Sequence, residues 1–349
     1  MKRRQPLLLL PAWAICLLVS SCVTAPQTRP QRQSGESVVF VGDEPAALAW
    51  LPLPHEPVRV RASYEAATNV LNYEAGRDFA VDYGAGTLRR LPGSRLPDFR
   101  TNSLFGRQEF DHSKFPGFGN RGFFAFVDYS FSRTEPWPRQ DDQTRFLPAS
   151  RAKLAAGGTF KLVAFGDSIS AGGDASRPDL IFWQRWAEDL RRHHPGARIT
   201  AVNGATGGDS TVQALQRLQA KVLDEKPDLV LVGFGMNDHN RGGVPLAAFE
   251  GNLAELIARI RSATSAEVVL FSAFPPNPQW KFGSHRMAEY ARATERAAQA
   301  AGCAYADVFD NWETVARRKK PEDLLANNIN HPNDFGHWVY YRVLCDLGL

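Results

Sequence analysis

The amino-acid sequence predicts an α/β protein with a doubly wound parallel sheet, preceded by a small β-rich domain. Three observations support this prediction. The length of 349 residues and the hydrophobic fraction of 44% suffice for about two cores. After Ala152, short apolar runs alternate with amphipathic segments, as strands and helices do in a three-layer sheet. Before that point the chain is dense in proline, glycine and aromatic residues and has no long helical period.

The first residues have the features of a secretory signal peptide. Three basic residues at positions 2–4 precede the stretch LLLLPAWAICLLV, which Pro11 interrupts and which is shorter than the roughly 20 residues of a membrane span. The segment VSSC at positions 19–22 is similar to the lipobox of bacterial lipoproteins, in which the cysteine is acylated after cleavage. We expect a signal peptide over residues 1–21 and a lipid anchor on Cys22. Cleavage without lipidation is the alternative.

The expected location is therefore extracytoplasmic, in a bacterial cell envelope, with the lipid anchor as the contact with the membrane. A polar run follows the cysteine, and we expect it to form a flexible tether over residues 22–37. The β-rich accessory domain is expected over residues 38–148, where short alternating runs such as VRVRASY and FFAFVDYSF occur. Its aromatic side chains form either a core or a sugar-binding surface. The candidates for that surface are Trp50, Tyr64, Tyr73, Tyr83 and Trp137.

Residues 152–349 are expected to form the α/β domain. Five apolar runs, FKLVAF, RITAVN, DLVLVG, EVVLFSA and AYADVF, are each long enough for a buried parallel strand. Amphipathic segments separate them. In VPLAAFEGNLAELIARIR the apolar residues recur at spacings of three and four, which predicts a helix with one buried face. Sheets of this kind bind ligands at the carboxyl ends of their strands.

Polar and small residues follow these strands at the points where the strands end. FKLVAF ends in Gly-Asp-Ser at residues 166–168, and RITAVN runs into a glycine-rich turn at residues 204–209. DLVLVG runs into Gly-Met-Asn-Asp at residues 235–238, and His-Pro-Asn-Asp at residues 331–334 precedes the last amphipathic segment. These are the groups that acyl transfer requires, because the serine attacks, the histidine takes its proton and N–H groups hold the oxyanion.

In this order and on this pattern of strands, the four blocks resemble the SGNH subgroup of the GDSL esterase and lipase family over about residues 160–349. The resemblance implies a flavodoxin-like sheet of about five parallel strands, with Ser168 as nucleophile and His331 as base. It also implies an oxyanion hole built from Ser168, Gly208 and Asn237. It implies no cofactor, and no cluster of histidine, cysteine or carboxylate side chains has the spacing of a metal site.

One position departs from the family pattern. The family usually carries an aspartate three residues before the histidine, where this chain has Asn328. Three arrangements are compatible with this change. The first is a Ser168–His331 dyad in which Asn328 or a backbone carbonyl orients the ring, the second uses a carboxylate such as Asp323 or Asp307, and the third is a decayed site that only binds. We favour the dyad because the nucleophile, the base and the oxyanion donors are all present.

The loop FSAFPPNPQWKFGSH after the fourth strand lies at the same predicted sheet edge and is expected to shape the substrate pocket. The rings of Trp280 and Phe282 suit either a sugar or an acyl chain. His239 follows the asparagine block closely enough to be a further candidate lining residue. Apart from Cys16 in the presumed signal peptide and the candidate lipidation site Cys22, the chain has only Cys303 and Cys345. We expect these two to be buried thiols, with one disulfide as the alternative.

Composition excludes one class of function. The chain has 41 basic and 37 acidic side chains, so it offers no basic field for nucleic acid. An envelope esterase with an added β domain resembles enzymes that remove acetyl groups from polysaccharides. We therefore expect a serine esterase that forms an acyl-enzyme and O-deacetylates a carbohydrate. The alternatives are a short-chain esterase or lysophospholipase of the envelope, and a non-catalytic carbohydrate-binding protein.

Overall fold

The computed structural model describes residues 30–132 and 142–349. The predicted signal peptide at residues 1–21, the predicted lipidation site Cys22 and the aromatic residue Trp137 lie outside these ranges. Within the ranges, no helix combines the length and the apolar character that a membrane span requires.

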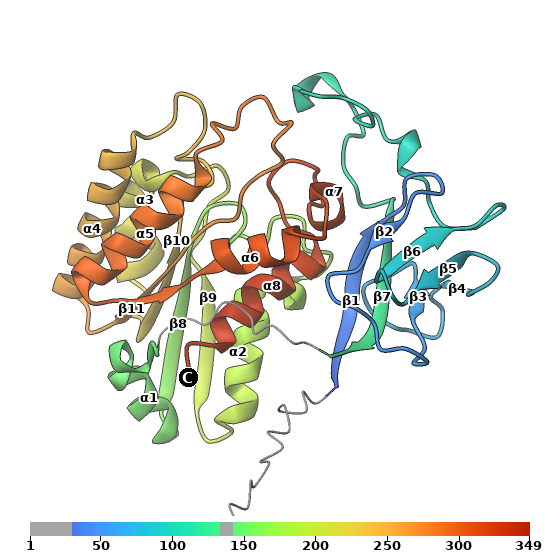
Figure 1. Cartoon of the computed structure of the whole chain (residues 1–349). Coiled ribbons are helices and arrows are strands. Elements are labelled where there is room, and N and C mark those ends of the chain that lie inside the picture. Colours follow the sequence, from blue (N-terminus) through green and yellow to red (C-terminus); the bar gives the residue numbers. More distant parts are fainter. Residues whose placement is uncertain (1–29, 133–141) are drawn as a thin grey trace, which may run out of the picture.

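A sheet of five parallel strands forms the centre of the second part of the chain (Figure 1). Its order is β12-β11-β10-β8-β9, so the chain starts in β8, steps to one side into β9 and then crosses over β8 into β10. This reversal is the topological switch point, where ligands bind in doubly wound sheets. The predicted fold class is confirmed. The strands are β8 (Thr159–Gly166), β9 (Arg198–Asn203), β10 (Leu229–Gly233), β11 (Glu267–Phe271) and β12 (Ala304–Ala306).

Helices cover both faces of this sheet. Because parallel crossovers are right-handed, the change of direction after β9 sends α2 to one face and α3, α4 and α5 to the other. α8 packs beside α2, and α4 packs between α3 and α5. The helices are α1 (Pro148–Ala155), α2 (Phe182–His193), α3 (Thr211–Leu218), α4 (Leu246–Ala263), α5 (Met287–Ala301), α6 (Val308–Ala316), α7 (Pro321–Leu324) and α8 (Asp334–Cys345).

The core lies between these layers. Every residue of β10 is buried, because helices cover both sides of a central parallel strand. The predicted apolar face of α4 packs against the sheet through Phe249, Leu253 and Ile257. α3 continues directly into a π-helical turn (Gln219–Leu223). Short 3-10 turns occupy Phe99–Thr101, His112–Lys114, Thr144–Phe146 and Pro178–Leu180.

The first part of the chain is built from antiparallel strands in two small sheets, with orders β1-β7-β3-β4 and β2-β6-β5. Tyr73 is buried in their shared core, and Trp50 stacks on Phe131 with ring centroids 5.6 Å apart. Both therefore contribute to packing. The strands are β1 (Gln31–Val39), β2 (Ala46–Ala47), β3 (Arg59–Arg61), β4 (Asn72–Tyr73), β5 (Phe79–Asp82), β6 (Thr87–Arg90) and β7 (Phe124–Phe131).

The flexible tether expected over residues 22–37 is wrong for its second half, because Gln31–Val39 form strand β1, which pairs with β7. Of the polar side chains that suggested a tether, those of Gln33, Glu36 and Ser37 are buried, whereas those of Gln31, Arg32 and Ser34 are exposed. The Glu36 carboxylate accepts a hydrogen bond from the hydroxyl of Tyr129 at 2.6 Å and lies 3.1 Å from the ammonium of Lys319. Polar composition therefore marks an internal interface here.

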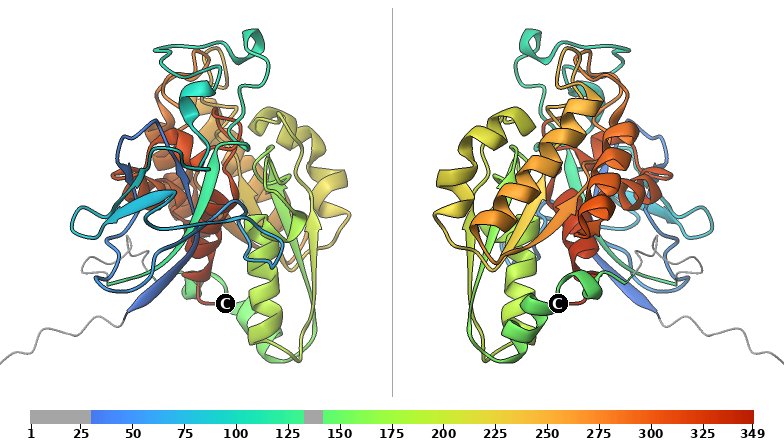
Figure 2. Two further views of the ribbon diagram at one scale, coloured as in Figure 1. Left: turned by 90° about the vertical axis from the view of Figure 1, so that its right-hand side faces the viewer. Right: turned by 90° about the vertical axis from the view of Figure 1, so that its left-hand side faces the viewer.

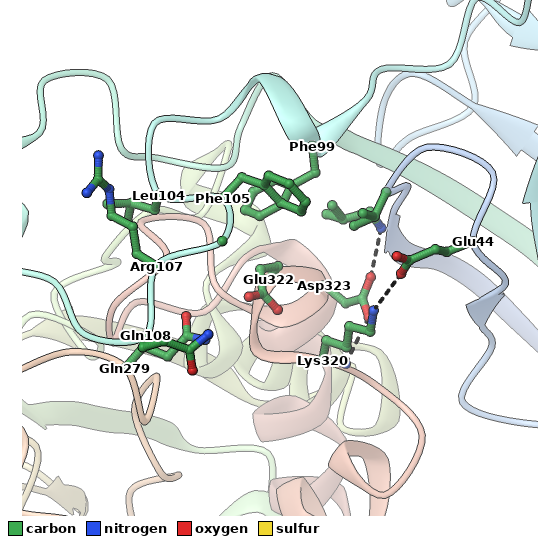
Figure 3. A pocket seen from close by; sticks show the side chains of 13 residues that line it. Glu44, Phe99, Leu104, Phe105, Arg107, Gln108, Gln279, Lys320, Glu322 and Asp323 are labelled. Carbon is green, nitrogen blue, oxygen red and sulfur yellow. Dashed lines mark hydrogen bonds and ion pairs between the residues drawn. The ribbon is translucent and has the colours of Figure 1, made fainter.

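The β-rich region packs against the side of the α/β layers that carries α7 and α8, as both views in Figure 2 show. A cavity of about 170 Å³ lies at this junction, between the loop at residues 99–108 and α7 (Figure 3). On its right-hand side in the figure, Asp323 accepts the backbone N–H of Val39 at 2.7 Å and Lys320 pairs with Glu44 at 3.7 Å. The two regions thus share polar contacts across a packed interface.

Candidate active site

The serine block lies at the end of the central strand β8. Gly166 has no room for a side chain, since a Cβ there would lie 2.4 Å from Oγ of Ser170. The carboxylate of Asp167 then accepts the backbone N–H of Ile169 at 2.9 Å, which closes a turn around Ser168. Burial raises the pKa of Asp167 to about 7. The turn leaves Ser168 half-buried at the switch point of the sheet.

His331 lies against this serine although the two residues are far apart in the sequence. Its Nε2 is 2.9 Å from Oγ of Ser168. The amide oxygen of Asn327 accepts the backbone N–H groups of residues 329–331, each at 2.9 Å. The N–H of Ala326 also donates to the carbonyl of His331 at 2.9 Å. The loop between α7 and α8 is therefore folded around its own asparagine, which holds the imidazole in place.

Asp174 occupies the other side of the imidazole. Its Oδ2 lies 2.9 Å from Nδ1 of His331, and the guanidinium of Arg121 donates to its Oδ1 at 2.8 Å. The hydrogen bond from His331 and the contact with Arg121 lower the pKa of Asp174, so the carboxylate is ionised at neutral pH. Ser168, His331 and Asp174 form a continuous row of hydrogen-bonding groups.

The backbone of the Asp174 loop explains how a carboxylate so close to the serine in sequence reaches the histidine. Gly172 has φ +114° and Asp174 has φ +61°, a left-handed conformation that is uncommon outside glycine. Gly173 lies between them, and a Cβ on it would lie 3.2 Å from Cγ of His331. The glycine pair therefore lets the backbone pass close to the imidazole before the aspartate turns back to meet Nδ1.

The prediction that Asn328 orients the imidazole needs correction, because Nδ1 of His331 contacts Asp174 instead. Asn328 is buried, with φ +59°. Its amide oxygen accepts hydrogen bonds from the side chains of Asn120 at 3.2 Å and Asn277 at 3.4 Å. Asn328 thus joins the histidine loop to two other segments of the chain.

The two carboxylates considered as replacements for the missing aspartate, Asp323 and Asp307, both make structural contacts elsewhere. Asp323 accepts the backbone N–H of Val39, and Asp307 caps the start of α6 by accepting the N–H of Asp310 at 3.1 Å. Asp174 was missed because the family pattern directs attention to the residues just before the histidine. The available signal was the Gly-Gly-Asp sequence six residues after the serine.

Gly208 lies in the turn that follows β9, where it has φ +82° and is exposed. The N–H of Thr206 donates to the carbonyl of Gly166 at 3.0 Å, which ties this turn to the end of β8. A Cβ on Gly207 would lie 3.8 Å from Cβ of Ser168. The turn therefore lies beside the serine.

Asn237 follows β10 and is half-buried. One hydrogen of its amide donates to the carbonyl of Asp209 at 2.9 Å, and a primary amide carries a second hydrogen for another acceptor. The neighbouring carboxylate of Asp238 accepts the N–H groups of Thr211 at 2.9 Å and Gly235 at 3.1 Å. Burial raises the pKa of Asp238. These bonds fix the asparagine loop against the start of α3.

The prediction that His239 lines the pocket does not hold, because the ring is buried. Its Nδ1 lies 2.6 Å from the carbonyl of Met236, and the ring packs edge-on against Tyr290. Burial also lowers the pKa of His239. The residue supports the loop that carries the asparagine.

Trp280 and Phe282 lie in an aromatic cluster that includes a residue of the β-rich region. Trp280 is 6% exposed, and its indole N–H donates to Nδ1 of His112 at 3.1 Å. Phe282 is 38% exposed, with its ring centroid 5.8 Å from that of Trp280. Of the two, Phe282 is the one with surface to offer a ligand.

A pocket of about 250 Å³ adjoins Asp174 and is formed by both regions of the chain. Aromatic side chains of the β-rich region form one wall, and the loop after β8 with the start of α8 forms the other. Its lining residues are Ala62, Ser63, Tyr64, Arg121, Phe124, Phe126, Asp174, Ser176, Ala326, Asn333 and Asp334.

Metal-ligating side chains and cysteines do not form part of this site. Among the residues that the structure describes, no group of three or more His, Cys, Asp and Glu side chains is arranged to hold a metal ion. Cys303 and Cys345 are free thiols, and burial raises the pKa of both, that of Cys345 to about 12.

A comparison with protein families matches residues 164–339 to the GDSL-like lipase/acylhydrolase family. The matched segment runs from β8 into α8 and includes the serine, glycine, asparagine and histidine blocks.

Curated relatives match parts of the same region. An arylesterase of Vibrio mimicus is 35% identical over 117 residues, which cover 34% of this chain and 56% of the relative. An uncharacterized lipoprotein, YqeF, of Bacillus subtilis is 36% identical over 77 residues, which cover 22% of this chain and 31% of the relative. The chain thus spans little more than half the length of the arylesterase.

Among solved structures, a two-domain esterase active on acetylated mannans, co-crystallized with mannopentaose, superimposes with a TM-score of 0.49 at 22% identity. The match covers 58% of this chain and 52% of the other.

Proposed function

The chain belongs to the GDSL-like lipase/acylhydrolase family, and from this premise we propose that it is a serine esterase that works through an acyl-enzyme intermediate. One observation carries the proposal. Oγ of Ser168, the imidazole of His331 and the carboxylate of Asp174 are joined by two contacts of 2.9 Å each. This is the arrangement of nucleophile, base and orienting acid that activates a serine hydroxyl.

In the first half of the reaction, Oγ of Ser168 attacks the ester carbonyl while Nε2 of His331 takes the hydroxyl proton. The imidazolium that forms is stabilised by the ionised carboxylate of Asp174, which also holds the tautomer with a proton on Nδ1. The alcohol then leaves with the proton from Nε2, and the acyl group stays on the serine. In the second half, His331 activates a water molecule that releases the acid and restores the serine.

The negative charge on the carbonyl oxygen is held by three donors. These are the backbone N–H groups of Ser168 and Gly208 and the side-chain amide of Asn237, whose other hydrogen is occupied by the carbonyl of Asp209. Donors that are fixed before the reaction stabilise the transition state without further reorganisation. The ties of the glycine turn to β8 and of the asparagine loop to α3 supply that rigidity here.

As substrate we propose an O-acetylated carbohydrate or polysaccharide. The pocket beside Asp174 supports this choice, because the part-exposed ring of Tyr64 suits the apolar face of a sugar and polar side chains such as Ser63 and Arg121 line the same pocket. Its volume of about 250 Å³ lies below the range of about 300–1,000 Å³ for drug-sized ligands, so it suits one small ring rather than a long chain.

We further propose that the protein is lipidated at Cys22 and faces the outside of the cytoplasmic membrane. The lipobox-like segment at residues 19–22 supports this proposal, and one of the relatives is named as a lipoprotein. Metabolic labelling with a palmitate analogue tests it: incorporation should require Cys22 and disappear in Cys22→Ser.

Hydrolysis assays on the purified protein test the proposed reaction. We expect release of p-nitrophenol from p-nitrophenyl acetate and of acetate from acetylated mannan or xylan oligosaccharides. Ser168→Ala and His331→Ala should both lose this activity. Ser168→Ala should also lose covalent labelling by a fluorophosphonate. Ser262→Ala, an exposed serine at the end of α4, is the matched control. Equal rates for wild type and Ser168→Ala would overturn the proposal, and faster cleavage of octanoate or lysophospholipid would move the substrate to lipids.

A further inference from the structure

We infer that Arg121, which belongs to the β-rich region, is a positioning residue for the reaction. It holds the carboxylate of Asp174 in the orientation that hydrogen-bonds the imidazole of His331. The inference rests on the proposed function, because it assigns Arg121 a role through the acid of that site. It makes the β-rich region a working part of the active site.

The contact geometry is the first support. The two oxygens of the Asp174 carboxylate are engaged on different sides: Oδ2 lies 2.9 Å from Nδ1 of His331, and Oδ1 lies 2.8 Å from Nη2 of Arg121. A carboxylate held at both oxygens cannot rotate about its last bond without breaking one of two charge-assisted contacts. The guanidinium therefore fixes the plane in which the other oxygen meets the imidazole.

The second support is the position of Asp174 in the chain. The family pattern places the acid on the histidine loop itself, three residues before the base. Here the acid comes from a separate loop, with a left-handed residue directly after two glycines, and its side chain is 26% exposed. Backbone hydrogen bonds such as that from Gly173 to the carbonyl of Ser168 at 2.7 Å hold the main chain of this loop, but they do not fix the side-chain rotation of a part-exposed aspartate, which a contact from outside the loop can fix.

The third support is the anchoring of Arg121 itself. Its neighbour Asn120 is fully buried and binds the histidine loop: its N–H donates to the carbonyl of Ala326 at 2.7 Å, and its amide donates to the carbonyl of Leu325 at 3.0 Å. The same amide donates to Asn328 at 3.2 Å. The dipeptide Asn120-Arg121 thus touches both loops of the site, the histidine loop through one residue and the aspartate loop through the other.

Other side chains of the β-rich region hold the flank of the aspartate loop. Glu65 accepts a hydrogen bond from Arg177 at 2.6 Å, and the hydroxyl of Tyr64 accepts one from Arg185 at 2.7 Å. Of these contacts between the two regions, only the one from Arg121 reaches the carboxylate of Asp174. The side chain of Arg121 is 59% exposed, and an ion pair this open adds little to folding stability. Its effect should therefore appear in turnover.

A double-mutant cycle tests whether Arg121 acts through Asp174. With p-nitrophenyl acetate we expect Arg121→Ala to lower kcat by about 3- to 30-fold, because a catalytic group loses its orientation while substrate binding is unchanged. In the Asp174→Asn background the same change should cost less than about twofold, since the group it positions is already gone. Arg100→Ala is the matched control, an exposed arginine paired with Asp98 at 2.6 Å.

Chemical rescue supplies a readout that a merely structural role would not move. The pocket of about 250 Å³ that borders Arg121 and Asp174 gives a small cation access to the carboxylate. Methylguanidinium, at concentrations far below those that unfold proteins, should restore kcat in Arg121→Ala. It should leave the Asp174→Asn and Arg100→Ala variants unchanged. If Arg121→Ala does not fold, Arg121→Lys and Arg121→Gln take its place, and the lysine variant should retain the higher kcat.

The outcomes separate the two proposals. An active wild type with Arg121→Ala within about twofold of it, or with an equal loss in the Asp174→Asn background, overturns the positioning role and leaves the esterase proposal standing. A wild type that is no more active than Ser168→Ala overturns the esterase proposal and the positioning role with it. Loss, non-additivity and rescue together support both.

Discussion

Replacing Asp174 by asparagine tests the row of hydrogen bonds that runs from the carboxylate through His331 to Ser168. The substitution keeps the size of the side chain and removes its charge. The amide oxygen can still accept from Nδ1, but it does not balance the imidazolium, and its NH₂ group can instead stabilise the wrong tautomer of the ring. The change therefore isolates the contribution of the carboxylate charge and of the tautomer that it fixes.

The expected loss follows from the geometry. Unit charges about 4 Å apart attract each other by about 4 kcal/mol at an effective dielectric constant of about 20, and this corresponds to about 10³-fold in rate. Solvent and the guanidinium of Arg121 already screen part of the Asp174 charge, because the side chain is 26% exposed. We therefore expect kcat to fall by about 10²- to 10³-fold, less than the roughly 10⁴-fold loss in the serine-protease template.

Steady-state hydrolysis of p-nitrophenyl acetate at neutral pH measures this loss. Asp179→Asn is the matched control, because Asp179 lies a few residues further along the chain, is 63% exposed and pairs with Arg177. Its kcat should equal that of wild type. A kcat for Asp174→Asn within about threefold of wild type would refute the reasoning, since the carboxylate would then contribute nothing beyond a neutral hydrogen bond.

Three other changes have expected outcomes. Ala62→Trp should fill the pocket beside the active site and raise KM for acetylated oligosaccharides while leaving p-nitrophenyl acetate hydrolysis unchanged; equal KM values would remove that pocket from sugar binding. The pKa of Asp167 is about 7 in the folded protein and about 3.9 in the unfolded chain. Between these pH values the folded state keeps a proton on Asp167 that the unfolded state has lost. The contribution of Asp167 to folding stability therefore falls as pH rises from about 4 to 7. Asp167→Asn should flatten the dependence of Tm on pH in that window, and an unchanged slope would contradict this assignment. Lys319→Met should lower the free energy of unfolding, measured in urea, by about 3–5 kcal/mol, because it removes the ammonium that pairs with the buried carboxylate of Glu36. In the control Lys320→Met, at an exposed lysine, the free energy of unfolding should stay within about 0.5 kcal/mol of wild type. Similar losses in both variants would argue against a stabilising buried pair.

The sheet and the ends of its strands were predictable because both depend on local sequence. A buried parallel strand needs a continuous apolar run, so β8 and β10 could be located from composition alone. The residues just after these strands must meet at one sheet edge, so Ser168 and Asn237 could be expected on the same side of the molecule. The histidine block was assigned from the resemblance to the family pattern, in which a His-Pro-Asn segment supplies the base.

The acid of the site could not be predicted in the same way. Its distance from His331 in sequence is nearly the length of the matched domain, and the contact depends on the backbone conformations of Gly172 and Gly173. No periodicity encodes such a turn. The ion pair between Asp174 and Arg121 was even harder to predict from local sequence, because it joins two regions whose relative placement depends on their shared interface.

The extent of the β-rich region was misjudged for a related reason. The polar segment before residue 38 has the composition of a linker, and composition cannot reveal that Glu36 meets a lysine almost at the other end of the chain. Burial of polar residues is uncommon unless they are paired, and the partner here is contributed by tertiary structure.

The buried pair of Glu36 and Lys319 also constrains the order in which the regions of this protein can fold. During synthesis β1 is made first, but its carboxylate has no ammonium to neutralise it until the segment leading into α7 has emerged. An early β-rich intermediate must therefore keep this edge hydrated. The two regions should then close together in one cooperative step, which calorimetry would record as a single unfolding transition.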